Sequence, residues 1–402
     1  FTLALVDQKI EEHGLELGSR ARPVQPGDSV AVGPFRIDAT PPGAPGAPGA
    51  PGAPGAGENQ RRDHFDGVYQ LLAGQDLSHD LTRQAFQQLL SGGLTTAQIA
   101  GLLVGLRVKG ETAEEVAAAA QVMRDLVTPV ELPAGTEVVD LCGTGGDGAQ
   151  TFNISTACMF VLAGAGAKVG KHGGRSVSSN SGSADVLELL GANINLKPEQ
   201  VAQSIAEVGI GFMFAPNHHS AMRFAGPVRK ELGVRTVFNI LGPLTNPANA
   251  KRQVMGVYSP NLLELQAEVL RRLGSVQALI VHGENGMDEL CIECDSSIAE
   301  LRDGDIRHYR IKPEDFGLSR ASHSSLHAGS VQESRDKIFH ALNGKGGAIG
   351  DIVLLNSAAG LYTAGLVSSL KEGVDLARST VAAGAAIRKL NEFVDFTKSL
   401  EQ

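Results

Sequence analysis

The chain has 402 residues and 42% of them are apolar, which is enough for two or three domains with a substantial core. Its formal charge of -9 and its pI near 5.7 argue against a nucleic-acid-binding surface, and no apolar stretch is long enough to span a membrane. Four cysteines are too few for a disulfide framework, and residues 1–7 lack the basic flank of a secretory signal. We therefore expect a cytoplasmic protein whose partners include neither nucleic acid nor a membrane.

Residues 1–40 are expected to be a fused appendage without an independent function. A helix is predicted over residues 3–13, followed by alternating apolar residues on either side of Gly33-Pro34. Forty residues with so few apolar groups should not fold stably alone. This piece weakly resembles a fragment of bacterial metallo-β-lactamase-type ribonucleases, but it lacks their His/Asp-rich metal motif. A Gly-Ala-Pro linker of extended, polyproline-type conformation is predicted over residues 41–61.

Residues 62–130 are predicted to form a helical domain, to which part of 198–235 is a candidate addition. Ser78, Thr95 and Thr112 each precede a segment of helical periodicity, and the last two begin capping-box patterns with Gln98 and Glu115. One apolar stripe at helical spacing predicts core or a subunit interface rather than a ligand site; it consists of Ile99, Leu102, Leu103 and Leu106.

The sequence pattern changes from Glu137 onward, where short apolar runs alternate with segments of helical periodicity. The runs lie at 138–141, 167–169, 252–258 and 278–282. This alternation is typical of a mostly parallel sheet covered by helices. The fold class is therefore α/β, with a small N-terminal helical domain and a larger α/β domain over 131–402.

A glycine-rich loop follows the first of these apolar runs. Four glycines lie between positions 143 and 148, so the backbone there can turn tightly and bring N–H groups close to a phosphate. The spacing also satisfies G-x-G-x-x-G, but the region about 20 residues further on is basic and has no carboxylate for a ribose, which disfavours a dinucleotide. A Walker-type loop is excluded because His172, not Ser or Thr, follows Lys171.

Two further segments carry candidate chemistry. Residues 171–183 follow a short strand and offer cations, glycines and serines, a set of donors that suits a phosphorylated substrate, and a helix is expected to continue from Asp185. Asp288-Glu289 follows a Gly-rich turn, where two carboxylates can converge on Mg²⁺ together with substrate phosphates.

Cys291 and Cys294 form a single C-x-x-C without a second pair or nearby histidines, so a zinc site is not expected. The flanking residues 289–294 alternate like a strand. On a strand, positions i and i+3 face opposite sides, which predicts that the two sulfurs diverge and act as ordinary apolar groups.

Five strings in a fixed order give residues 62–402 a close resemblance to the anthranilate phosphoribosyltransferase family. They are Gly143-Thr144-Gly145-Gly146-Asp147, Asn153-Ile154-Ser155-Thr156, Lys171 to Glu188, Arg235 to Pro247 and Gly286-Met287-Asp288-Glu289. The resemblance implies a fold of the nucleoside phosphorylase/phosphoribosyltransferase type and a homodimer formed through the helical domain. It also implies Mg²⁺-dependent transfer of phosphoribosyl from 5-phosphoribosyl-1-diphosphate to the amine of anthranilate, a step of tryptophan biosynthesis that releases diphosphate.

The resemblance also assigns site residues. Those implied for phosphoribosyl diphosphate are Gly143, Gly146, Asp147, Thr151, Asn153, Ile154, Ser155, Thr156, Lys171, Arg175, Ser178, Ser179 and Ser183. Those implied for anthranilate are Gly143, His172, Gly174, Arg229, Gly242 and Pro243. The implied magnesium ligands are Ser155, Asp288 and Glu289. The resemblance assigns no catalytic residue, and His172 is the nearest candidate for a general base.

One position departs from the family pattern. The family usually has Asn after Lys-His-Gly, where this chain has Gly174, so weaker binding of anthranilate is expected rather than loss of activity. Two alternatives remain: a pyrimidine nucleoside phosphorylase-like enzyme, and an inactive family-like binding protein.

Overall fold

The computed structural model describes residues 29–32, 35–38, 67–176 and 181–400, and the chain divides into units Phe1–Glu58 and Asn59–Gln402. In the first unit, β1 (Ser29–Val32) and β2 (Phe35–Asp38) pair as an antiparallel ladder, as the alternating residues predict. The expected helix at 3–13 and the linker at 41–61 lie outside the described residues.

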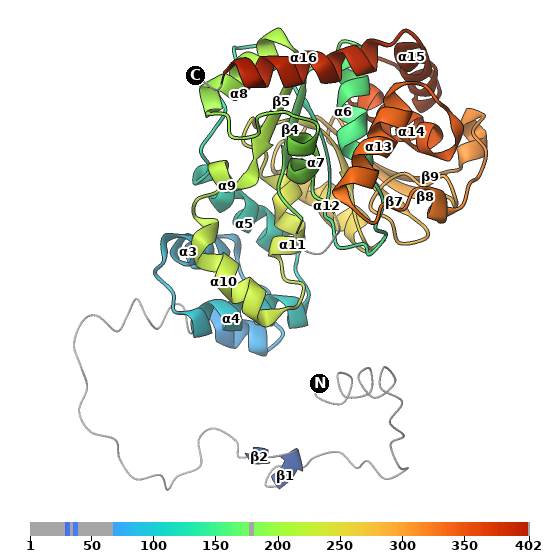
Figure 1. Ribbon diagram of the computed structural model, residues 1–402. Helices are drawn as coiled ribbons and strands as arrows, with labels where there is room; N and C mark the ends of the chain where they lie inside the picture. The colour runs from blue at the N-terminus through green and yellow to red at the C-terminus, as the bar shows by residue number, and fades with distance from the viewer. Residues whose placement is uncertain (1–28, 33–34, 39–66, 177–180, 401–402) are drawn as a thin grey trace, which may run out of the picture. The chain divides into compact units, whose positions relative to one another are not determined.

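The second unit is built on a seven-stranded sheet of order β5-β4-β3-β6-β7-β8-β9 (Figure 1). Neighbours from β5 to β7 run parallel, and β8 and β9 are antiparallel. The strands are β3 (Val139–Gly143), β4 (Val169–Gly173), β5 (Ile210–Phe214), β6 (Arg252–Gly256), β7 (Gln277–Gly283), β8 (Ser296–Arg302) and β9 (Asp305–Ile311).

Helices cover both faces of this sheet (Figure 1). The α-helices are α3 (His79–Ser91), α4 (Thr96–Lys109), α5 (Ala113–Asp125), α6 (Ile154–Gly164), α7 (Ser183–Leu189), α8 (Pro198–Glu207), α9 (Ala215–His218), α10 (Met222–Leu232), α11 (Phe238–Leu241), α12 (Leu262–Arg272), α13 (Val331–Leu342), α14 (Gly347–Thr363), α15 (Leu370–Ala382) and α16 (Ala385–Ser399). Residues 67–72 are also helical, and short 3₁₀ helices lie at Gly242–Leu244, Pro313–Phe316 and His323–Ser325. Among the described residues, no helix combines the length and apolarity needed to cross a bilayer.

The two faces of the sheet bury alternate residues of the same strands. In β7, Leu279 and Val281 pack with α6 and α14, whereas Ala278 and Ile280 pack with α5 and α12. This alternation follows from the two-residue period of a strand. Because both faces are covered, β7 is buried along its whole length.

The helical bundle consists of α3, α4 and α5, with α10 packed against α3 and α4. Ser78, Thr95 and Thr112 are the N-caps of α3, α4 and α5, and Thr95 and Thr112 both form capping boxes, as predicted. The Ile99 stripe of α4 is buried in the bundle core, also as predicted.

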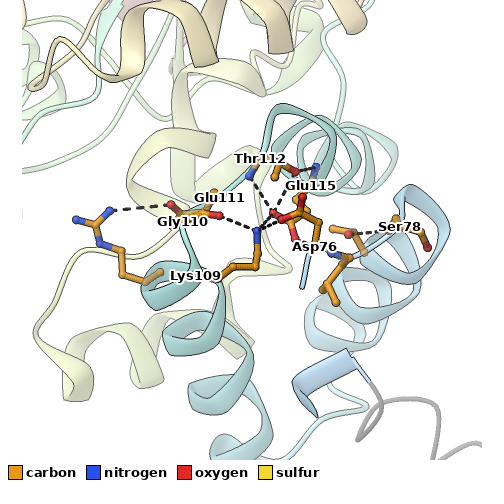
Figure 2. A network of polar contacts seen from close by, with 10 residues as sticks. Asp76, Ser78, Lys109, Gly110, Glu111, Thr112 and Glu115 are labelled. Carbon is orange, nitrogen blue, oxygen red and sulfur yellow. Dashed lines mark hydrogen bonds and ion pairs between the residues drawn. The ribbon is translucent and has the colours of Figure 1, made fainter. Parts of the chain in front are cut away.

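A buried ion pair joins the three helices (Figure 2). The Lys109 Nζ atom lies 2.9 Å from Glu115 Oε2 and 2.7 Å from Asp76 Oδ1, and Glu115 is 1% exposed. Glu115 also accepts hydrogen bonds from the backbone N–H groups of Leu77 and Thr112. Burial by itself would lower the pKa of Lys109, but the hydrogen bonds from its ammonium to the two carboxylates outweigh that effect and raise it. The charge of Glu115 is therefore balanced by Lys109. Its hydrogen bonds link the segment that precedes α3 to the N-terminus of α5.

Candidate active site

The segments with candidate chemistry meet at one edge of the sheet. The glycine-rich loop leaves the carboxyl end of β3, the Lys171 segment ends β4, and the Asp288 loop follows β7. These strands are neighbours, with β6 between β3 and β7. The chain proceeds from β3 to β4 and β5 on one side and then returns to β6 on the other, so β3 and β6 flank a topological switch point, where α/β proteins commonly bind ligands.

Asp288 lies directly against the glycine-rich loop. Its Oδ2 accepts a hydrogen bond of 2.7 Å from the Gly145 N–H, and its own N–H donates to Asp147 Oδ2 at 3.3 Å. A Cβ atom added at Gly143 would lie 2.2 Å from Asp288 Oδ2, and one added at Gly256 would lie 1.5 Å from the Asp288 carbonyl oxygen. Glycine at these two positions is therefore what lets the two loops approach each other.

The carboxylates in this region raise one another's pKa. Burial, followed by the charge of Asp147, raises the pKa of Asp288 to about 7. Burial, followed by the charge of Asp288, raises the pKa of Glu289 to about 8. Both side chains keep partial contact with solvent. Within the described part of the chain, no group of three or more His, Cys, Asp or Glu residues is arranged to hold a metal by itself, so a cation here would need further oxygen ligands.

Lys171 is a buried cation beneath this edge of the sheet. Its side chain is 2% exposed, and Nζ donates to the Leu141 carbonyl at 2.5 Å and to Ser155 Oγ at 3.1 Å. Ser155 lies in the first turn of α6, where its hydroxyl accepts from the ammonium and its backbone N–H contacts the Glu289 carboxyl. Strand β4 extends to Gly173, so the expected loop from 171 to 183 is shorter than predicted and its first three residues belong to the sheet.

Residues 151–156 differ in where they lie, since some make contacts beside the site and others are buried in the core. Thr151 forms an isolated bridge with His327, and Asn153 precedes α6, where its Oδ1 accepts hydrogen bonds from Ser181 and Ser334. Ile154 and Thr156 are buried in the core, so only their backbone groups could contact a ligand at this edge.

In the loop after β4, the positively charged side chain is already paired with carboxylates. Arg175 forms ion pairs with Asp185 and Glu188 of α7, at 3.0 and 2.5 Å. The Ser183 hydroxyl donates to the Gly174 carbonyl at 3.5 Å. Ser178 and Ser179 lie outside the described residues.

His172, expected to lie near an aromatic acceptor, packs beside His219. Its ring is 4.9 Å from that of His219, and its Nε2 is buried without a hydrogen-bond partner among the described residues. Burial, followed by the neighbouring His219, lowers the pKa of His172 well below its ordinary value, so the ring is neutral. Gly242 and Pro243 begin a short 3₁₀ helix, and the Pro243 carbonyl accepts a hydrogen bond from Gln253.

Arg229 is the candidate for binding a substrate carboxylate. Its guanidinium lies over the Phe238 ring at 5.3 Å, and no carboxylate in the described ranges forms an ion pair with it. Burial lowers the pKa of Arg229. Gly226-Pro227 lies inside α10, since tertiary packing can override the low helix propensity of proline.

Two residues that hold the segments of the site in place were not predicted from the sequence. The Arg235 guanidinium donates to the Gly146 carbonyl and stacks 4.0 Å from the Tyr258 ring centroid. Asn246 donates to buried Asp140 and to the Gly170 carbonyl, both at 2.8 Å, so it joins β3 to β4 below the site. Only the long-range contacts identify these roles, although both residues lie in the family-like string from 235 to 247.

The prediction that the sulfurs of Cys291 and Cys294 diverge is wrong, although both residues pack with the apolar core as expected. Residues 289–294 lie in the loop between β7 and β8, with a bend at 292–294, rather than on a strand. The bend brings the two sulfurs to 2.7 Å instead of turning them apart.

Two family models match the second unit of the chain. The "Glycosyl transferase family, helical bundle domain" matches residues 68–127, and the "Glycosyl transferase family, a/b domain" matches residues 135–387. The anthranilate phosphoribosyltransferase of Leptothrix cholodnii is 54% identical over 338 residues, which are 84% of this chain and 98% of the relative. That of Methylibium petroleiphilum is 56% identical over 326 residues, 81% of this chain and 95% of the relative. The ribonuclease resemblance of residues 1–40 finds no support in these matches.

Solved structures agree with this assignment. The anthranilate phosphoribosyltransferase of Thermus thermophilus has a TM-score of 0.78 and 43% identity, covering 83% of this chain and 99% of that one. The Saccharomyces cerevisiae enzyme, solved in complex with PRPP and Mg, has a TM-score of 0.77 and 29% identity, covering 84% and 99%. The named relatives favour neither the nucleoside phosphorylase nor the inactive binding protein. This chain belongs to the anthranilate phosphoribosyltransferase family.

Proposed function

We propose that this chain transfers the phosphoribosyl group of 5-phosphoribosyl-1-diphosphate to the amine of anthranilate, giving N-(5-phosphoribosyl)anthranilate and diphosphate in tryptophan biosynthesis. The observation that carries the proposal is the Asp288–Gly145 hydrogen bond of 2.7 Å, which joins a carboxylate loop to a glycine-rich anion loop. A diphosphate leaving group needs N–H donors and a hard cation at the same place. The family membership of the chain supports this substrate pair.

The carboxylates fit a magnesium ion. Burial, followed by the charge of a neighbouring carboxylate, raises the pKa of Asp288 and of Glu289, and a bound cation would offset that charge. We assign Asp288, Glu289 and the Ser155 hydroxyl as its ligands, with substrate phosphate oxygens completing the coordination. Bound there, Mg²⁺ would neutralise part of the charge that builds up on diphosphate.

The chain's own groups would bind the remaining parts of phosphoribosyl diphosphate. Gly145 and Gly146 have positive φ values of 68° and 73°, so the loop takes a conformation that side chains disfavour and that exposes backbone groups to an anion. Lys171 supplies positive charge from below through Ser155. Arg175 remains a proposed ligand, although it would have to loosen its pairing with Asp185 and Glu188 to reach a phosphate.

Anthranilate would bind on the β4 side of the site. Its carboxylate suits Arg229, whose planar guanidinium can pair with both oxygens, and its ring would lie near His172 and the Gly242-Pro243 segment. The amine of anthranilate is itself the nucleophile, so positioning and electrostatics supply most of the acceleration and no nucleophilic Ser or Cys is needed. Neutral His172 is the candidate acceptor for a proton from that amine.

The helical bundle is the proposed surface for a homodimer. An apolar groove on α3 and α4 is lined by Leu77, Leu81, Leu94 and Leu102. Beside this bundle, Leu72 is 73% exposed. A second copy would cover this apolar surface. We also propose that the boundary between the helical and α/β domains lies near residue 130 and that the protein is cytoplasmic.

The decisive test follows loss of anthranilate fluorescence in the presence of 5-phosphoribosyl-1-diphosphate and Mg²⁺. The wild-type chain should consume anthranilate, and Asp288→Asn should lose most of the rate because a neutral amide holds Mg²⁺ poorly. Asp395→Asn, at an exposed position of α16, is the matched control and should retain the wild-type rate. Absence of anthranilate consumption by the wild-type chain, or an undiminished rate in Asp288→Asn, would reject the proposal.

A further inference from the structure

We propose that Cys291 and Cys294 form a thiol–disulfide exchange site that reacts with small-molecule disulfides and closes to an intramolecular disulfide. The inference does not depend on the transferase activity. It starts from the 2.7 Å contact in which the Cys294 thiol donates to Cys291 Sγ. A disulfide bond is about 2.05 Å long, so closure needs about 0.7 Å of movement by the sulfurs.

The backbone around Cys291 maintains this arrangement. Its sulfur accepts hydrogen bonds from the N–H groups of Glu293 at 3.2 Å and Cys294 at 3.1 Å. Its own N–H donates to Ser296 Oγ at 2.8 Å. The turn between the two cysteines therefore holds both sulfurs on the same side.

A neighbouring segment supports the turn from outside. The Ala321 N–H donates to the Ile292 carbonyl at 3.1 Å, and the Arg320 guanidinium donates to the Glu293 carbonyl at 3.2 Å. On the other side, both backbone groups of Leu290 are bonded to the Asn356 amide, at 2.9 and 3.0 Å. These bonds fix the backbone on both sides of Cys291.

The two thiols differ in access. Cys291 is 1% exposed, whereas Cys294 is partly exposed. The accessible Cys294 is therefore the residue that meets a disulfide in solution, and the buried Cys291 is the one that resolves the product. The other two cysteines of the chain, Cys142 and Cys158, lie on β3 and α6 and not in this loop.

The reaction balances without a metal or a cofactor. The Cys294 sulfur attacks one sulfur of the small disulfide, a mixed disulfide forms, and the first small thiolate leaves with the proton from Cys294. Cys291 then attacks the Cys294 sulfur, its proton goes to the second leaving thiolate, and the intramolecular bond forms. The two cysteines are oxidised, and the small disulfide is reduced to two thiols.

Oxidised glutathione is a suitable probe for the native full-length chain. After incubation, the protein is denatured, its free thiols are alkylated, and its intact mass is measured. The wild-type chain should fall from four to two alkylated thiols without a glutathione adduct, and a dithiol reductant should restore all four. Peptide mapping should place the bond between Cys291 and Cys294.

Two variants separate the two roles. Cys291→Ser should accumulate a stable glutathione adduct on Cys294 because no resolving thiol remains, and Cys294→Ser should stay unmodified because Cys291 is buried. Cys158→Ser is the matched control and should still lose the two thiols of the loop. Four alkylatable thiols in the treated wild-type chain, or a persistent wild-type adduct, would overturn the inference.

Discussion

Gly174 can be judged from the space around it. A Cβ atom added there would meet only Ala215 Cβ, at 4.0 Å, which is ordinary contact. The neighbouring Gly173 differs, since its Cβ would lie 2.2 Å from Ser183 Oγ. The Asn that the family pattern predicts at 174 would therefore fit here without a steric clash of its Cβ.

We predict that Gly174→Asn lowers the Michaelis constant for anthranilate about fivefold, since one polar contact contributes about 1 kcal/mol. Steady-state kinetics with anthranilate varied would measure this. Gly173→Asn serves as a contrast, because the clash with Ser183 should disturb the loop and impair the enzyme. An unchanged Michaelis constant in Gly174→Asn would show that the position does not contact anthranilate.

Gly143 has the opposite property, because its lack of a Cβ is what makes room for Asp288. We predict that Gly143→Ala displaces the Asp288 carboxylate and slows anthranilate consumption about a hundredfold, the usual cost of misplacing a catalytic group by about 1 Å. The control is Gly350→Ala in α14, where an added Cβ meets nothing within 4 Å. Near-normal activity in Gly143→Ala would mean that the Asp288 loop adjusts freely.

At the scale of elements, capping and an ion pair define the helical bundle. The three N-caps could be predicted from local sequence because each bonds to a backbone N–H three residues later. The Lys109–Glu115 pair could not, because its importance arises from burial between helices (Figure 2). The same distinction applies to Cys291 and Cys294, where a bend replaced the expected strand.

We predict that Glu115→Ala lowers the free energy of unfolding by about 3 kcal/mol, because two backbone N–H groups lose their acceptor and the buried Lys109 ammonium keeps only Asp76 and the Gly110 carbonyl. Denaturant unfolding followed by circular dichroism measures the loss. Glu114→Ala, in the same turn but exposed, should cost much less. Equal effects of the two substitutions would contradict a special role for the buried pair.

At the scale of the whole molecule, the fold brings Asp147, after β3, next to Asp288 and Glu289, after β7. Burial, followed by the charges of the neighbouring carboxylates, raises the pKa of Asp288 to about 7 and that of Glu289 to about 8. Because a carboxyl must be ionised to bind a cation, protons compete with Mg²⁺ as the pH falls through these values.

We therefore predict that Mg²⁺ affinity falls about tenfold or more between about pH 8 and about pH 6, and that binding releases protons. Calorimetry in buffers of different ionisation enthalpy would measure both effects. Asp288→Asn should reduce the number of protons released. A Mg²⁺ affinity independent of pH over this range would contradict the proposed coordination.

The sequence by itself determined the helix starts, the α/β alternation and the strings from Gly143 to Glu289 that identify the family, because these depend on local periodicity, backbone propensity and motif order. Only the tertiary structure decided which of those residues meet. In the folded chain, Asp288 accepts a hydrogen bond from Gly145, and Arg175 forms an ion pair with α7. Gly226-Pro227 lies inside α10, and the two cysteine sulfurs are in contact. These outcomes depend on contacts between residues far apart in the chain or on the bend of a loop, and the local pattern of a sequence carries no information about either.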